Sequence, residues 1–257
     1  VVSGTSSVVV NRNFTQLIRI MAAPTVNINA TIETTQTLVL QSNSTVIIAD
    51  EAHLVVQNLE ITEGQVIVYG PVLVRNHFVL PQNVSLYLQR DQPAAPRERV
   101  FVVDGDLVTL RGELRIDVLP APALEAVRCR DLVFEEGSRL VLVIDRWDEQ
   151  LHPVIACSGE VAWGEDTELV VMFREVPTPP RDFATGDRLL VARFASMTSR
   201  FSTVTFAQQN LYADGEWRSV YESNMLYLEW LERDTDSATS VVVATAAMAS
   251  ATALALI

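Results

Sequence analysis

Acidic and arginine side chains gather in one short segment, at a spacing that could bind or cleave an acidic polysaccharide. The segment VVDGDLVTLRGELRID supplies Asp104, Asp106, Arg111, Arg115 and Asp117. Residues two positions apart on a strand share a face, so Asp104 and Asp106 are expected to converge. Clustered carboxylates beside an arginine suit glycoside cleavage or cation binding, which makes Asp104, Asp106 and Arg111 the catalytic candidates. Asp-Gly-Asp is equally an ordinary polar turn, so a non-enzymatic role is favoured.

Other chemistry has less support in the sequence. A second charged cluster, VIDRWDEQ, contains Asp145, Arg146, Asp148 and Glu149. The three histidines, His53, His77 and His152, lie far apart without ligand spacing, so no metal site is predicted. The chain also lacks a nucleophile elbow, a phosphate-binding glycine loop and a dinucleotide fingerprint, and no cofactor is expected.

Two kinds of residue are typical of proteins that have left the cytosol. Cys129 and Cys157 are the only cysteines and permit one disulfide, the alternative being two buried thiols. Four Asn-x-Ser/Thr tripeptides provide glycan acceptors if the chain passes through a eukaryotic secretory route, and otherwise reflect chance in a threonine-rich chain. Their asparagines are Asn13, Asn29, Asn43 and Asn83.

Charge is unevenly distributed along the chain. The 257 residues have a net charge of −13, and all 19 basic residues are arginine. Residues 1–90 have four arginines against five acids, whereas residues 91–257 have fifteen against 27. An acidic chain without a basic patch would be repelled by nucleic acid, which we therefore exclude as a partner.

Short β-branched runs separated by polar residues dominate the sequence and predict strands. Early examples are TLVL at 37, TVIIA at 45 and QVIVY at 65, and later ones are RLVLVI and RLLVARF. Their spacing fits coils of about twenty residues, and hairpin Asp-Gly turns are few. We therefore predict an all-β, right-handed parallel β-helix (β-solenoid), with an antiparallel β-sandwich as the alternative.

The last strand-rich segment resembles the closing segment of bacterial autotransporter passengers and related β-helix surface proteins. GDRLLVARFASMTSRFSTVTF is followed by LYADGEWRSVYESNMLYLEWL, and the matching residues are Gly186, Asp187, Phe201, Tyr221 and Leu226 to Leu228. The resemblance covers about fifty residues. It implies a β-helix in an extracellular setting. The nearby Trp217, Tyr221, Tyr227 and Trp230 are expected to cap the open end of the solenoid core.

The C-terminus is uncharged from Ser237 to Ile257. Its apolar end follows small residues, which is typical of a GPI-attachment signal with Asp236, Ser237 and Ala238 as the attachment window. The polar spacer is short for such a signal, and a membrane span or a structural element is the alternative. We therefore divide the chain into a β-solenoid ectodomain at 1–233, with a sub-boundary near 91–99, and an anchor signal or membrane segment at 234–257.

These patterns together predict a surface protein. The favoured hypothesis is an extracellular, membrane-anchored glycoprotein with a structural, coat or adhesion role, whose partners are the membrane and surface glycans or other surface proteins. The alternative is a carbohydrate-active β-helix enzyme, a polysaccharide lyase or hydrolase that uses the Asp104/Asp106 region. A third hypothesis is an autotransporter passenger fragment, in which the glycosylation tripeptides would have no meaning.

Overall fold

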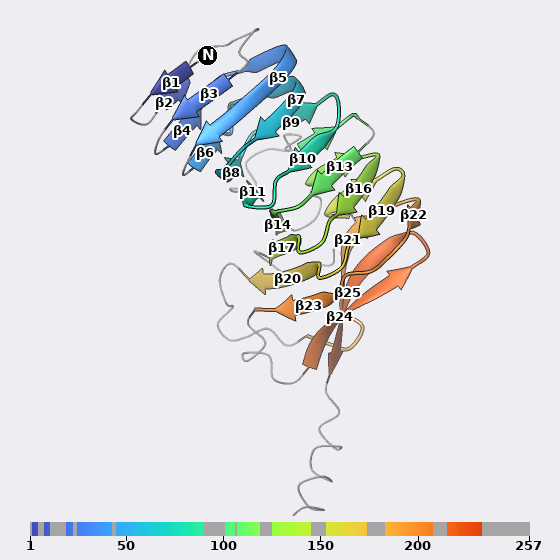
Figure 1. The fold of residues 1–257 in the computed structure, drawn as a ribbon. Coiled ribbons are helices and arrows are strands. Elements are labelled where there is room, and N and C mark those ends of the chain that lie inside the picture. Colours follow the sequence, from blue (N-terminus) through green and yellow to red (C-terminus); the bar gives the residue numbers. More distant parts are fainter. Residues whose placement is uncertain are drawn as a thin grey trace, which may run out of the picture.

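Two large sheets account for nearly all of the described chain. The computed structural model describes residues 2–4, 8–10, 19–22, 25–42, 45–89, 101–105, 107–118, 125–144, 153–173, 183–207 and 215–232. Within these ranges the protein is all-β, without a helix, and Figure 1 shows its strands stacked along one long axis. The strands form one sheet of 16 strands, which we call sheet A, and one of nine strands, sheet B.

Sheet B is a single ladder in which each strand pairs with the next along the stack. Its strands, in spatial order, are β2 (Val8–Val10), β4 (Thr25–Ile28), β6 (Thr45–Ile48), β8 (Gly64–Val68), β11 (Val84–Leu88), β14 (Glu113–Val118), β17 (Arg139–Ile144), β20 (Glu168–Phe173) and β23 (Thr203–Phe206).

Sheet A begins as one ladder and divides at β7 into two branches. Its first strands are β1 (Val2–Gly4), β3 (Arg19–Ala22), β5 (Ile32–Ser42) and β7 (Leu54–Ile61). One branch continues through β10 (Phe78–Leu80), β13 (Leu107–Leu110), β16 (Asp131–Phe134), β19 (Glu160–Trp163) and β22 (Ser196–Met197). The other contains β9 (Val72–Val74), β12 (Phe101–Val103), β15 (Val127–Cys129), β18 (Ile155–Cys157), β21 (Arg188–Arg193), β25 (Met225–Glu232) and β24 (Gly215–Glu222).

Parallel pairing joins almost every pair of neighbouring strands. Among the described pairs, only β21 with β25 and β24 with β25 are antiparallel. An antiparallel sandwich would need hairpin-connected neighbours throughout, so the alternative fold prediction is wrong. The large parallel sheets are compatible with a β-solenoid, in which the chain returns to each sheet once per coil.

The chain returns to sheet B at regular intervals in the first half of the protein and at longer intervals afterwards, and we call each such repeat a coil. In sheet B, Thr45 is the register partner of Gln65, and Tyr69 and Gln89 in neighbouring coils are 20 residues apart. Later register partners in sheet B are 26 to 35 residues apart, from Glu113 with Arg139 to Glu168 with Thr203. The added residues fall between a sheet B strand and the following sheet A strand, as with the 12 residues from 89 to 100 between β11 and β12.

The main hydrophobic core runs through the stack, and a smaller cluster of Val141, Val143 and Val170 is buried on the outer side of sheet B. Alternate residues point inward, so Val26 and Ile28 of β4 are fully buried while Thr25 and Asn27 are partly exposed. The cluster of buried side chains extends from Val10 to Trp230. Continuous contact along the axis means that each coil buries its apolar side against its neighbours.

The corners between strands bring successive coils into close contact. Gly112 lies between β13 and β14, where an added Cβ would overlap the carbonyl oxygens of Pro81 and Val84 in the preceding coil. In the turn between β9 and β10, the Asn76 amide donates to Asn58 Oδ1 of β7 at 2.9 Å, and the Asn58 amide donates to Thr37 Oγ1 of β5 at 3.1 Å. These stacked polar residues satisfy each other where the chain turns.

The predicted sub-boundary near 91–99 lies outside the described residues. Pairing of the strands on either side of it is continuous, because Ser85 of β11 is the register partner of Glu113 of β14 and Val74 of β9 is that of Val103 of β12. Both sheets therefore extend past this point of the sequence.

Candidate functional site

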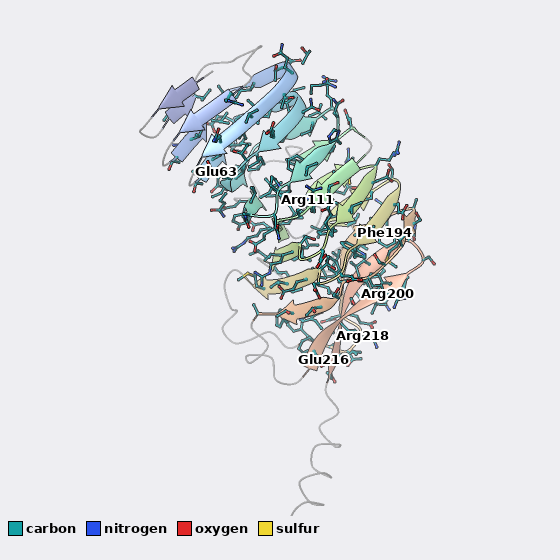
Figure 2. The ribbon with its side chains drawn as sticks, in the orientation of Figure 1. Glu63, Arg111, Phe194, Arg200, Glu216 and Arg218 are labelled. Atoms are coloured by element: carbon teal, nitrogen blue, oxygen red, sulfur yellow. The ribbon has the colours of Figure 1, made fainter. Side chains whose placement is uncertain are left out.

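The predicted catalytic residues lie on a turn and at a corner. Asp104 follows β12, is exposed, and donates its backbone N–H to the carbonyl of Val74 at 2.9 Å. Asp106 lies outside the described residues. Arg111 lies in the turn between β13 and β14 (Figure 2), beyond the opposite end of β13 from Asp104. The structure therefore gives no convergence of Asp104 with Arg111.

Arg111 has a structural partner in the next coil. Its Nε and Nη2 donate to Glu135 at 2.7 and 3.1 Å, a two-pronged ion pair with both side chains largely exposed. The hydrogen bonds that Arg111 donates to Glu135, and the negative charge of that carboxylate, raise the pKa of Arg111 above the ordinary arginine value. Arg111 thus joins two corners of the stack, and polysaccharide cleavage by this region stays a prediction.

Charged side chains on the outer face of sheet B form a ladder across successive strands. Arg139 Nε donates to Glu168 at 2.8 Å, and Arg139 Nη1 donates to Glu113 at 3.5 Å. Ser85 donates to Glu113 and Thr205 donates to Glu168, which extends the ladder at both ends. Alternating charges in register favour parallel alignment of the strands, although exposed pairs add little individually.

Polar side chains next to this ladder surround Tyr87. Its hydroxyl donates to Asp117 Oδ1 at 2.7 Å, and the guanidinium of Arg115 lies over its ring at 4.7 Å. Asp117 is only 1% exposed. The sequence indicated Arg115 and Asp117 as members of one charged cluster. In the structure both contact Tyr87, a residue that the sequence pattern did not indicate.

The outer face of sheet B has no charged side chain on β4, β6, β8 and β11. Its outward positions form two columns, Thr25, Thr45, Gln65 and Ser85 beside Asn27, Ile47, Ile67 and Tyr87. All eight side chains are partly exposed. We call these eight residues the neutral face.

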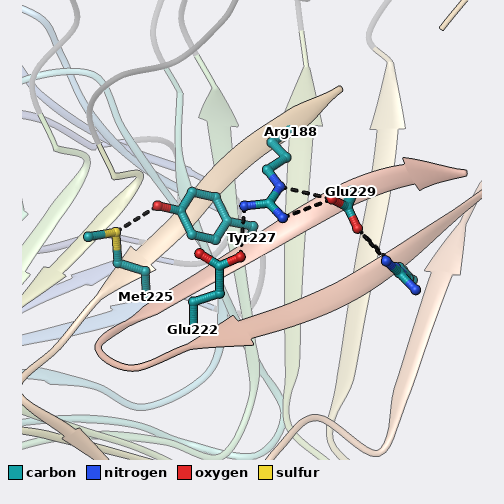
Figure 3. A network of polar contacts seen from close by, with 6 residues as sticks. Arg188, Glu222, Met225, Tyr227 and Glu229 are labelled. Atoms are coloured by element: carbon teal, nitrogen blue, oxygen red, sulfur yellow. Dashed lines mark hydrogen bonds and ion pairs between the residues drawn. The ribbon is translucent and has the colours of Figure 1, made fainter. Parts of the chain in front are cut away.

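A buried carboxylate connects the last three strands of sheet A. Figure 3 shows Glu229 beside Arg188, and Arg188 also reaching Glu222. Arg188 Nε donates to Glu229 Oε1 at 2.9 Å, and Arg218 Nη2 donates to Glu229 Oε2 at 2.6 Å. Hydrogen bonds from Arg218 and then Arg188 hold the pKa of Glu229 below its usual value.

The same hairpin places an aromatic cluster at the end of the core. Trp217 and Trp230 are buried with ring centroids 5.4 Å apart, and Phe183 lies 5.2 and 5.1 Å from them. Both tryptophans belong to the buried core cluster, and their expected role in capping a solenoid end stays a prediction. Tyr227 instead lies on the outer side, where Arg188 lies over its ring at 5.3 Å.

The residues behind the autotransporter-like resemblance lie in this closing region. Gly186 adopts a φ of 97° just before β21, a conformation that suits glycine. The backbone N–H of Phe201 donates to the Tyr221 hydroxyl at 3.0 Å, and burial is the largest cause of the raised pKa of Tyr221. Leu226 and Leu228 of β25 are fully buried. The resemblance itself stays a prediction.

Cys129 and Cys157 are brought together, but as two thiols. They are register partners on β15 and β18, both are buried, and their Sγ atoms are 3.4 Å apart. The structure records them as free cysteines, without the expected disulfide bond. The hydrogen bond with Cys129, followed by burial, raises the pKa of Cys157 far above the ordinary thiol value.

Two of the four glycosylation tripeptides lie in the described part of the chain. Asn83 is exposed in the turn before β11, whereas Asn29 is partly buried and donates its backbone N–H to Val10 at 2.9 Å. Asn13, Asn43 and the proposed lipid attachment window at Asp236, Ser237 and Ala238 fall outside the described residues, as does His152.

Two further observations concern the described residues only. They contain no helix of the length and apolarity that crossing a membrane requires. They also contain no group of three or more His, Cys, Asp or Glu side chains arranged to hold a metal ion.

Comparison with known proteins identifies no relative of this chain. No family model, no curated protein and no solved structure matches it. The function is therefore inferred from the residues and their geometry.

Proposed function

We propose that this chain is the ectodomain of an extracellular surface protein with a structural, coat or adhesion role. The observation that supports the proposal is the continuous parallel pairing of sheet B from β2 to β23, whose outer face carries partly exposed side chains in register over β4, β6, β8 and β11. Extended faces of this kind suit lateral packing or contact with another surface. Ion pairs such as Arg111 with Glu135 also connect successive coils, although each exposed pair adds little stability.

The proposal includes the finer fold, in which the strands close into a right-handed β-solenoid. Three features support it: the division of sheet A into two branches, the short corners between strands, and a core cluster shared by both sheets. A closed coil of three strands buries the inner face of each without an additional layer. An experimental structure in which the two sheets do not enclose a common core would contradict this fold.

The surface location is part of the same proposal. A GPI anchor at Asp236, Ser237 or Ala238 and glycans on the Asn-x-Ser/Thr sites would place the solenoid outside the cell. The test is expression of the full chain behind a signal peptide in eukaryotic cells, with detection by surface biotinylation. Phosphatidylinositol-specific phospholipase C should release the biotinylated protein.

A matched control makes this experiment decisive. Removal of residues 241–257 should give a secreted protein that the phospholipase leaves unchanged, because the apolar end of the signal is missing. If the complete chain stays on the cells after phospholipase treatment, the lipid anchor is wrong. If it never reaches the surface, the surface role is wrong as well.

A further inference from the structure

We propose that the neutral face of sheet B binds an uncharged polysaccharide. This inference rests on the proposed surface role and names the class of ligand that the surface would contact. It concerns the eight outward side chains of β4, β6, β8 and β11, which the candidate catalytic residues do not include.

The neutral face is a regular array. Thr25, Thr45 and Gln65 are successive register partners, and Gln65 is the partner of Ser85, so one column runs straight across four strands. The second column, from Asn27 to Tyr87, follows the same register. Neighbouring strands are about 4.8 Å apart, and outward positions on one strand are about 6.6 Å apart. A periodic surface of this kind fits a polymer with its own repeat.

Charge favours an uncharged ligand. The eight positions have no charged side chain, although the whole chain has a net charge of −13. The charged ladder begins on the next strand, where Glu113 accepts from Ser85 and Arg115 lies beside Tyr87. The negative charge of the protein would repel a polyanion from the neutral face, whereas it would not repel an uncharged polymer.

The chemistry of the two columns matches the two kinds of surface on a sugar ring. Hydroxyl and amide groups of the first column can donate to and accept from sugar hydroxyls. Ile47 and Ile67 in the second column offer apolar contact to the C–H face of a sugar ring. Protein interfaces instead concentrate their binding energy in buried aromatic and arginine anchors, so a glycan is the favoured occupant.

The array is held rigidly from below. Between the outward residues lie Val26, Val46, Val66 and Leu86, each at most 1% exposed. Because packing fixes the backbone of these strands, the outward groups need little ordering when a ligand binds.

Co-sedimentation of the full chain with insoluble polysaccharides tests the proposal. The probes are cellulose and chitin as uncharged polymers and calcium-gelled polygalacturonate as a polyanion. We expect the protein to pellet with at least one uncharged polymer and to stay in solution with polygalacturonate. Ile67→Glu, which puts a charge in the centre of the face, should weaken binding at least about tenfold.

Leu73→Glu is the matched control, since Leu73 is an outward, partly exposed residue of the same coil on sheet A. Its binding should equal that of the unmodified chain. Thr45→Glu repeats the test at a position where apolar contact is smaller, in case Ile67→Glu fails to fold. Equal loss in Leu73→Glu, or unchanged binding in Ile67→Glu and Thr45→Glu, would overturn the proposal.

Failure of this inference is distinguishable from failure of the proposed surface role. If neither cellulose nor chitin retains the protein, or if polygalacturonate alone does, the neutral face is not an uncharged-polysaccharide site. The surface biotinylation result would be unaffected by either outcome.

Discussion

Cys129 and Cys157 occupy equivalent positions in successive coils, with their sulfur atoms 3.4 Å apart in the core. Exposure of the purified protein to oxidised glutathione should join them, because two thiolates in turn displace glutathione and leave a disulfide between the coils. A bridge between residues 28 positions apart is expected to stabilise the fold by about 3 kcal/mol. Alkylation followed by mass spectrometry, and urea unfolding with and without reductant, would measure both effects.

The reaction should be slow in the folded protein. Both thiols are buried, and the raised pKa of Cys157 keeps it protonated at neutral pH. Cys157→Ser leaves Cys129 as a single thiol that cannot form the bridge. Oxidant should therefore not stabilise this variant. Equal stability of oxidised and reduced wild-type protein would contradict the proposed link between coils.

Glu229 makes the closing hairpin sensitive to acid. Glu229→Gln should reduce the free energy of unfolding by about 1–3 kcal/mol, since two arginines lose a charged partner that is 7% exposed. The lowered pKa means that the ionised group stabilises the fold at pH values above its unfolded-state pKa. That contribution is lost as the pH falls through the folded-state pKa, which lies below the ordinary glutamate value.

Thermal unfolding from pH 3 to 7 checks this expectation. The wild-type midpoint should fall at the acidic end, and the Gln variant should fall less. Glu222→Gln is the control, because Glu222 is exposed and accepts one hydrogen bond from Arg188. A pH profile that is the same in wild type and Glu229→Gln would show that another carboxylate is responsible.

Gly112 is expected to be required for stacking of the coils. Gly112→Ala should destabilise the protein by about 1–3 kcal/mol, because its Cβ would overlap the carbonyl oxygens of Pro81 and Val84. Gly137→Asn provides the comparison: Gly137 has a φ of 72°, which asparagine tolerates, and its added Cβ would meet nothing within 4 Å. Urea denaturation in which both variants lose the same stability would contradict the close contact at Gly112.

Glycosylation should differ between the two described acceptor sites. Asn83 lies exposed in a turn, whereas Asn29 is partly buried and its backbone N–H is bonded to the preceding coil. In secreted protein from eukaryotic cells, Asn83→Gln should therefore abolish one glycosidase-sensitive mass increment, and Asn29→Gln should change little. The reverse result would mean that the glycan is added before the coils have formed.

The sequence predicts the early coils well because their apolar runs recur without interruption. Thr45–Ile48 and Gly64–Val68 were expected as strands about twenty residues apart, and they pair in that register. Later coils contain added segments of differing length between sheet B and sheet A. These segments hide the regular spacing of the apolar runs. The strands themselves remain recognisable there from their Val, Leu and Ile runs, but their partners do not.

The polar contacts could be predicted far less. The two-residue rule that was applied to Asp104 and Asp106 holds only within a strand, and Asp104 lies in the turn after β12. Arg111 pairs with Glu135, 24 residues away, and Glu229 with Arg188, 41 residues away. Such pairs depend on coil length, so they follow from the register and not from local spacing. Comparing the first positions of the runs ELRI, RLVL and ELVV would have indicated the ladder of Glu113, Arg139 and Glu168.

The varying coil length indicates where the chain can accommodate insertions. Extra residues enter the later coils at one corner, between the end of a sheet B strand and the next strand of sheet A, while both sheets keep their pairing. That corner is therefore a natural point of insertion, where evolution or an engineer can add a peptide without shifting the core. Because the strands on either side of these corners follow one another in register, several inserted peptides would be displayed in a row, at a pitch set by the spacing of the strands.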